Sequence, residues 1–253
     1  MSNEVDVNRY LKRIGLNTEP TLDLAGLTTL MQAHLTTVPF ENLDVFAGVP
    51  VRTDLEWSLD KIVDQNRGGW CFELNGAFGA LLDALGFSVT RIGAAVLLGG
   101  PNTTVDHLAL DVQLDRSYLV DVGFGDSFSV PLDLNVRGPQ DGGVATFEFF
   151  DSTQGLTLTR HDESGFPEPK YRFRRVALGL SDFDSVSDQL RSDTSLHWSK
   201  SPFATRLIEG GPKRLTLLPK VLKEVTPEGS TETPIAPDEW ETVLLEQFGL
   251  SLH

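Results

Sequence analysis

The segment Arg67-Gly68-Gly69-Trp70-Cys71-Phe72-Glu73-Leu74-Asn75 leads from a pair of glycines through the sole cysteine into a helical pattern. The apolar residues of that pattern recur three and four positions apart, and they are Leu74, Phe78, Leu81, Leu82 and Leu85. This spacing is typical of an amphipathic helix, and Gly86 follows as a stop signal. We therefore predict a helix that carries Cys71 within or just before its first turn.

Cys71 at the start of a helix is well placed for nucleophilic chemistry. The two glycines before it let the backbone turn sharply and approach a ligand closely. The helix dipole and the free N–H groups of the first turn favour a thiolate and can donate to an oxyanion. Gly-Gly turns before helices are common, however, and a lone cysteine is usually a small buried core residue. The segment alone leaves both interpretations open.

A cysteine nucleophile needs a base, and the chain has five histidines: His34, His107, His161, His197 and His253. His107 stands out because it opens an apolar strand-like run, whereas His34 reads as a helix C-terminal cap. A second apolar run contains Asp121, and a buried carboxylate without a partner is costly. If the two runs pair, Asp121 can accept from one imidazole nitrogen and leave the other facing the thiol. Asp121 could instead pair with Arg91, Arg116 or backbone N–H groups.

The apolar period divides the chain into a mainly helical part, up to about residue 90, and a strand-rich part after it. Short apolar runs separated by turn residues predict a small antiparallel barrel or sandwich. A last amphipathic helix begins near Trp240 and ends at Gly249. The segment 227–237 is the most linker-like of the chain, and we expect an exposed loop there.

The composition indicates a globular protein, with 253 residues, of which 40% are hydrophobic and 23% charged. A formal net charge of -15 disfavours contact with nucleic acid or anionic membranes. No apolar run is long enough to span a bilayer, and the N-terminus lacks a signal-peptide pattern. The single cysteine excludes an intramolecular disulfide and a CxxC-type zinc site. We predict a cytoplasmic protein with no nucleic-acid or membrane partner, no metal and no permanently bound cofactor.

Several motifs, in order, resemble those of the arylamine N-acetyltransferases. Residues 67–75 resemble the family signature RGGxCxExN, residues 107–110 its histidine strand, and residues 121–125 its aspartate strand with a glycine turn. Residues 38–43 resemble its N-terminal motif, residues 201–203 a later serine-phenylalanine segment, and residues 240–250 its last helix. The resemblance therefore covers nearly the whole chain, with the sole cysteine at the nucleophile position.

This resemblance implies an α+β fold with a cysteine-protease-like catalytic core. A helical N-terminal bundle over residues 1–90 carries the cysteine, and a central antiparallel β-barrel over residues 91–190 carries the histidine and the aspartate. An α/β lid over residues 191–253 completes the expected architecture.

The resemblance also assigns roles to single residues. It implies that Cys71, His107 and Asp121 form a catalytic triad. It places Phe124, Gly125 and Phe203 at the substrate or coenzyme A site. It further implies that Arg9, Glu41 and Arg67 form an ion network that braces the active-site loop.

The activity implied is transfer of an acetyl group from acetyl-coenzyme A to a small aromatic amine or hydrazine, through an acetyl-cysteine intermediate. Because coenzyme A is anionic and the chain is acidic, the donor requires a local positive or N–H-rich pocket. An amide synthase that releases an amino-polyketide from a carrier protein would use the same triad. The residues are also compatible with a cysteine amidase or hydrolase, and with a binding module that merely retains the fold.

Overall fold

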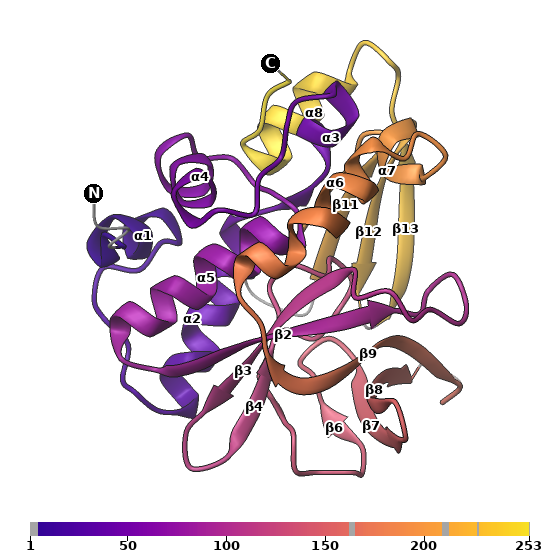
Figure 1. The fold of residues 1–253 in the computed structure, drawn as a ribbon. Coiled ribbons are helices and arrows are strands. Elements are labelled where there is room, and N and C mark those ends of the chain that lie inside the picture. The colour runs from indigo at the N-terminus through magenta and orange to yellow at the C-terminus, as the bar shows by residue number, and fades with distance from the viewer. Residues whose placement is uncertain (1–4, 162–164, 209–212, 227, 253) are drawn as a thin grey trace.

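The computed structural model describes residues 5–161, 165–208, 213–226 and 228–252. Helices come first along the chain, a barrel-like sheet follows, and a second sheet with short helices completes the molecule (Figure 1). This is the predicted α+β fold. None of the helices in these described ranges is long and apolar enough to cross a bilayer.

The N-terminal part is built from short helices around one long buried helix, α5. Its elements are α1 (Val7–Arg13), α2 (Leu24–Thr37), α3 (Leu43–Ala47), α4 (Leu55–Leu59), the π-helical turn η1 (Asp60–Asp64) and α5 (Cys71–Leu85). Aspartates start three of the helices, because the side chains of Asp6, Asp23 and Asp54 each accept a hydrogen bond from a first-turn N–H group. Helix α5 ends at Gly86, whose φ of 98° is left-handed, as the sequence predicts.

Helix α5 is the structural centre of the molecule. Every residue from Cys71 to Leu82 is buried, so the helix is enclosed on all sides over this length. Gly79 allows the barrel to approach closely, since a Cβ atom there would lie 3.1 Å from the side chain of Leu110. The helix therefore packs directly on the barrel strand that carries the histidine.

Eight antiparallel strands form the central sheet. They are β2 (Ser88–Val96), β3 (His107–Gln113), β4 (Ser117–Val120), β5 (Leu132–Asp133), β6 (Gln140–Asp141), β7 (Thr146–Ser152), β8 (Gly155–His161) and β9 (Pro167–Ala177), in the spatial order β5-β4-β3-β2-β9-β8-β7-β6. A side-chain amide bridges the two edge strands: Asp133 N donates to Gln140 Oε1 at 2.8 Å, and Gln140 Nε2 donates to Asp133 O at 3.1 Å. The sheet thus curls into a nearly closed barrel.

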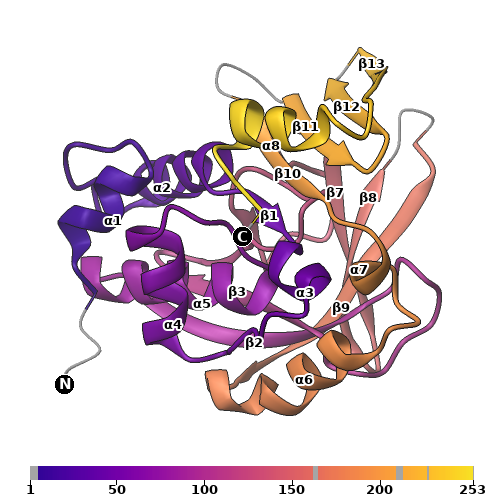
Figure 2. The ribbon, with the colours of Figure 1, turned by 90° about the horizontal axis from the view of Figure 1, so that it is seen from above.

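The C-terminal part is a second antiparallel sheet covered by a helix. Its elements are η2 (Leu180–Phe183), α6 (Asp184–Ser192), α7 (His197–Lys200), β10 (Ala204–Ile208), β11 (Lys213–Leu218), β12 (Val221–Thr226), β13 (Gly229–Pro234) and α8 (Trp240–Phe248). The N-terminal part contributes β1 (Phe40–Glu41) to this sheet, next to β10 (Figure 2). Trp240, Leu244 and Phe248 of α8 pack against Leu215 and Leu217.

The loop expected over residues 227–237 is instead largely a strand. Residues Gly229 to Pro234 form β13 and pair with β12 over its whole length, whereas Pro227 lies outside the described residues. The strand is at the edge of the sheet and mostly exposed. Polar residues and a terminal proline are tolerated at such an edge, so no apolar alternation marks it in the sequence.

His34 is a core residue, and the expectation of a helix cap at this position is wrong. Its side chain is fully buried, its Nε2 lies 3.1 Å from the hydroxyl of Tyr10, and its ring meets Phe78 edge-on at 5.0 Å. Burial, with a smaller effect of the charge of Arg13, lowers the pKa of His34 to about 3. The folded protein therefore holds a neutral imidazole in its core.

We expect His34 to make the protein less stable as the pH falls from 6.5 toward 3. In this range the unfolded chain protonates the histidine and the folded chain does not, so protonation favours unfolding. At about 1.4 kcal/mol per pKa unit, the loss at pH 4 amounts to about 3 kcal/mol. Urea unfolding at pH 7 and pH 4 measures it, and His34→Leu should remove this part of the pH dependence.

The matched control is Leu27→Ala, a core substitution on the same helix. It should lower the stability by a similar amount at both pH values, because no titrating group is lost. A pH dependence that is identical in His34→Leu and the wild type would contradict the assignment.

Candidate active site

Cys71 is the first residue of α5, and the start of this helix is held by a neighbouring carboxylate. The backbone N–H of Trp70 donates to Glu73 Oε2 at 3.1 Å, which fixes the residue before the helix. Cys71 itself is 8% exposed, so it lies at the rim of the core. The N–H groups of the first turn have no partner within the helix and point toward its N-terminal end.

The two glycines before Cys71 allow their segment to pack closely against residues 38–41. Gly69 forms a parallel bridge with Phe40, in which Gly69 O accepts from Glu41 N at 2.9 Å. A Cβ atom on Gly68 would lie 2.2 Å from the carbonyl oxygen of Pro39. Neither Gly68 nor Gly69 has a positive φ, so a sharp turn is not what requires them. They let the segment that bears the cysteine lie directly against residues 38–41.

The structure brings Cys71, His107 and Asp121 together. His107 opens β3 and Asp121 directly follows β4, and these two strands pair antiparallel. His107 Nε2 lies 2.7 Å from Asp121 Oδ2, with both side chains buried. The Cys71 side chain lies beside the same imidazole, close enough to contribute to the raised pKa of His107. Since Nε2 is engaged by the carboxylate, Nδ1 is the nitrogen left for the sulfur.

The electrostatics of this group favour a charged imidazole. Burial by itself lowers the pKa of His107, but the charge and hydrogen bond of Asp121, with a contribution from Cys71, outweigh it and raise the pKa to about 10. His107 is therefore protonated at neutral pH, in contact with the sulfur of Cys71 and the carboxylate of Asp121.

Asn75 ties the helix to both catalytic strands, a role that the sequence did not reveal. Its Nδ2 donates to Asp121 Oδ1 at 2.8 Å and to the carbonyl oxygen of Leu108 at 2.7 Å. Its Oδ1 accepts from Val122 N at 2.9 Å. Asn75 lies four residues after Cys71, hence on the same helix face. The four-residue spacing from Cys71 could have drawn attention to Asn75 in the sequence. It does not show that Asn75 bonds Asp121.

Aromatic side chains surround the imidazole. Phe124 meets the His107 ring nearly at a right angle, with centroids 5.2 Å apart, and Tyr171 of β9 lies 5.1 Å from both rings. Burial, followed by the charge of Asp121, raises the pKa of Tyr171 well above its usual value, so the phenol stays neutral. Sequence reasoning found Phe124 but not Tyr171, which comes from a distant strand.

Gly125 and Phe203, the other two expected substrate contacts, both adjoin Phe40. A Cβ atom on Gly125 would lie 3.0 Å from the Phe40 ring. The rings of Phe203 and Phe40 are 5.6 Å apart, and Trp198 lies 6.1 Å from Phe203. Phe203 is half-buried, so part of its surface faces solvent.

A buried ion network lies beneath the segment that precedes Cys71. Its residues are not all those that we expected, which were Arg9, Glu41 and Arg67. Glu41 and Arg67 belong to it, at 3.4 Å, but Arg9 does not. Arg9 is mostly exposed and pairs with Asp64. The further cation is Lys61, whose Nζ lies 2.7 Å from Asp44 and 2.9 Å from Glu73; Asp44 also contacts Arg67, at 2.9 Å.

Arg13 braces the loop in the way that we had expected of Arg9. It lies one helical turn further along α1 and donates to the carbonyl oxygens of Thr37, Ile62 and Arg67, at 3.0, 2.8 and 3.3 Å. Two arginines one turn apart are hard to distinguish in sequence, because the rotation of so short a helix about its axis decides which one faces the loop.

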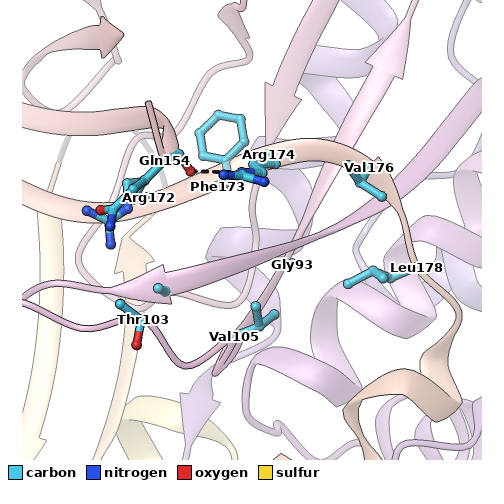
Figure 3. Close-up of a pocket in the computed structure, with 10 residues that line it drawn as sticks. Gly93, Thr103, Val105, Gln154, Arg172, Phe173, Arg174, Val176 and Leu178 are labelled. Carbon is cyan, nitrogen blue, oxygen red and sulfur yellow. Dashed lines mark hydrogen bonds between the residues drawn. The ribbon is translucent and has the colours of Figure 1, made fainter. Parts of the chain in front are cut away.

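A pocket of about 440 Å³ lies on the opposite face of β2 from the triad (Figure 3). His107 is paired with Ala94, and residues directly opposite in an antiparallel pair share a face. Gly93 and Ala95, which line the pocket, therefore face away from His107. The sheet separates this pocket from the candidate active site.

Comparison with known proteins identifies the family of this chain. A family model described as N-acetyltransferase matches residues 23–253. Human arylamine N-acetyltransferase 1 is 39% identical, over 98% of this chain and 95% of that protein. The chain belongs to the arylamine N-acetyltransferase family. Two further matches cover only part of the relative: those to the chicken pineal gland isozyme (39% identical) and to the Mycolicibacterium smegmatis protein (43% identical) span about half of those relatives, 52% and 47%.

Solved structures of arylamine N-acetyltransferases share the fold of this family member. The M. smegmatis structure is 28% identical with a TM-score of 0.91, and the match covers 98% of this chain and 93% of that chain. The Mycobacterium marinum structure in complex with CoA is 28% identical with a TM-score of 0.89, covering 96% and 92%.

The ion network gives a stability prediction. Lys61→Met removes the cation that faces three buried carboxylates, and breaking a buried ion network in this way costs about 3–5 kcal/mol. Arg9→Met is the matched control, because an exposed pair contributes less than about 1 kcal/mol. Chemical denaturation at pH 7 measures both. Equal losses in the two variants would show that Arg9 carries more of the network than its exposed position indicates.

Proposed function

We propose that the protein transfers an acetyl group from acetyl-coenzyme A to a small aromatic amine or hydrazine through an acetyl-cysteine intermediate. The observation that carries the proposal is the buried cluster of Cys71, His107 and Asp121 at the start of α5, in which His107 bonds Asp121 at 2.7 Å and Cys71 lies beside the imidazole. In this proposal acetyl-coenzyme A binds as the donor substrate and leaves as coenzyme A, and it is not a permanently bound cofactor. The proposal places the enzyme in the cytoplasm, where this donor is made and used.

In the first half-reaction Cys71 is acetylated. The proton of its thiol is held on His107, and the thiolate attacks the thioester carbonyl carbon. First-turn N–H groups of α5 donate to the oxyanion that develops on the carbonyl oxygen. The bond between the acetyl carbon and the coenzyme A sulfur breaks, and the leaving thiolate takes the proton from His107. Coenzyme A departs as a thiol and the acetyl group stays on Cys71.

In the second half-reaction the amine takes the acetyl group. Its nitrogen attacks the thioester carbon of acetyl-Cys71, and His107 accepts the proton that the nitrogen loses. The bond to the Cys71 sulfur breaks, which regenerates the starting pair. Aromatic amines suit this step because their nitrogen is unprotonated at neutral pH and their rings can stack on Phe124 or Phe203.

Asp121 and Asn75 keep the imidazole in position throughout. Asp121 binds Nε2 of His107, so Nδ1 stays directed at the sulfur and the incoming nucleophile. Asn75 holds the other oxygen of the carboxylate, which prevents its rotation. With both of its oxygens bonded, the carboxylate has one orientation and holds the imidazole in one orientation as well.

We expect acetyl-coenzyme A to add one acetyl group to Cys71, detectable by intact-protein mass spectrometry in the absence of an amine. Cys71→Ala should give no adduct, and His107→Ala should slow its formation by about 10²–10⁴-fold, because it removes the proton acceptor. The matched control is His34→Leu, which changes a histidine buried in the core beside Tyr10 and outside the triad. Appreciable transfer without His107 would contradict its assignment as the base.

The fate of the acetyl-enzyme separates an acetyltransferase from a hydrolase and from an amide synthase. We expect the adduct to persist in water and to disappear on the order of 100-fold faster when an arylamine is added, because the amine is the better nucleophile. Mass spectrometry at timed intervals measures both rates. Rapid loss without amine indicates a hydrolase, and no adduct from free acetyl-coenzyme A points to an amide synthase that requires a carrier protein.

A further inference from the structure

A second cleft, of about 570 Å³, lies between the barrel and the C-terminal sheet, away from the pocket of Figure 3. Its polar lining comes from both bodies: Asp126, Arg160 and His161 on the barrel side, and Arg214, Thr216 and Lys223 on β11 and β12. Figure 2 shows these two strands beside β7 and β8. The cleft thus brings cations from separate elements together.

The pleat of the C-terminal sheet explains why the cations share one side. Leu215 and Leu217 of β11 point toward α8, so the alternate residues Arg214 and Thr216 point toward the barrel. Thr216 is paired with Lys223 across the strands, and opposite residues share a face. Arg214 and Lys223 are therefore directed into the same cleft.

Arg214 is the unusual member of this group. It is 7% exposed, and in the described part of the chain its hydrogen-bond partner is the hydroxyl of Thr205, at 3.4 Å, with no carboxylate in ion-pair contact. Burial lowers the pKa of Arg214 to about 10, so the guanidinium stays charged at neutral pH. The guanidinium lines the cleft and has further N–H donors from which an anion bound there can accept hydrogen bonds.

The surrounding charge favours an anion as well. Arg160 and Lys223 add two cations to Arg214, and Asp126 is the one carboxylate among the described residues that line the cleft. Asp126 is engaged by Arg160 at 2.6 Å. Lys223 is only loosely paired, at 3.8 Å from Glu232, and is 37% exposed. In a chain with a net charge of -15, this is a local positive site.

The cleft also adjoins the candidate active site through one short turn. Gly123 lies against the cysteine, since a Cβ atom there would be 2.8 Å from Cys71 Cα. Gly125 lies against Thr205, the partner of Arg214, with a Cβ atom placed 3.4 Å from its methyl group. The turn of residues 123–126 therefore has the nucleophile at one end and the cleft at the other.

We propose that this cleft is an anion site in which Arg214, supported by Arg160 and Lys223, binds a phosphate group. A guanidinium can bind phosphate oxygens through two parallel hydrogen bonds, which the present contact with one hydroxyl does not use. The bound phosphate could come from either of two sources, coenzyme A or free inorganic pyrophosphate. The assignment to coenzyme A rests on the proposed function.

Calorimetric titration of the purified protein with pyrophosphate tests the site without any turnover. We expect saturable binding that weakens about tenfold or more in Arg214→Gln, the loss of a charge-assisted hydrogen-bond pair. The matched control Arg137→Gln alters an exposed arginine paired with Asp151 and should bind as the wild type does. Thermal unfolding shows that each variant is folded. Equal pyrophosphate binding in folded Arg214→Gln and wild type would overturn the proposal.

Steady-state kinetics identify the source of the phosphate. If it is the donor, Arg214→Gln should raise KM for acetyl-coenzyme A about tenfold with little change in kcat, and leave turnover of the phosphate-free donor p-nitrophenyl acetate unchanged. Loss of pyrophosphate binding with an unaltered KM would support the anion site and overturn coenzyme A as its occupant. Absence of acetyl transfer with intact pyrophosphate binding would reject the proposed function and not the site.

Discussion

The carboxylate of Asp121 is the point at which the helix and the barrel of this molecule are joined. One oxygen bonds His107, and the other accepts from Asn75 and from the backbone N–H of Gly123. Because Asn75 belongs to α5 and His107 to β3, this one buried group fixes the relative position of three chain segments. The cost of burying it is offset only when all these donors are present, so the site and the surrounding core form together.

Sequence reasoning singled out residues whose chemistry is unusual for their position in the chain. A lone cysteine before a helix, a histidine in an apolar run and an aspartate inside a strand are each unusual, and the structure brings them together. The spacing of apolar residues along the chain likewise predicted α5, a barrel built from short strands, and α8. In each of these cases the signal lies in adjacent residues.

The sequence could not show which distant side chains would meet. Lys61 and Asp44 look like ordinary surface charges, yet both are buried because Glu73 and Arg67 neutralise them. His34 was expected to cap a helix but fills the core beside Tyr10. Strand β13 is polar because an edge strand needs no apolar face. Each of these depends on tertiary contacts that no local pattern encodes.

The short strand β1 restricts how the molecule can open. It belongs in sequence to the helical part, yet it is hydrogen-bonded to β10 of the C-terminal sheet and bridged to Gly69, two residues before Cys71. A hinged swing of the C-terminal sheet would therefore have to break backbone hydrogen bonds next to the cysteine itself. Access to Cys71 therefore depends on side-chain movement, while β1 holds the three parts of the backbone together.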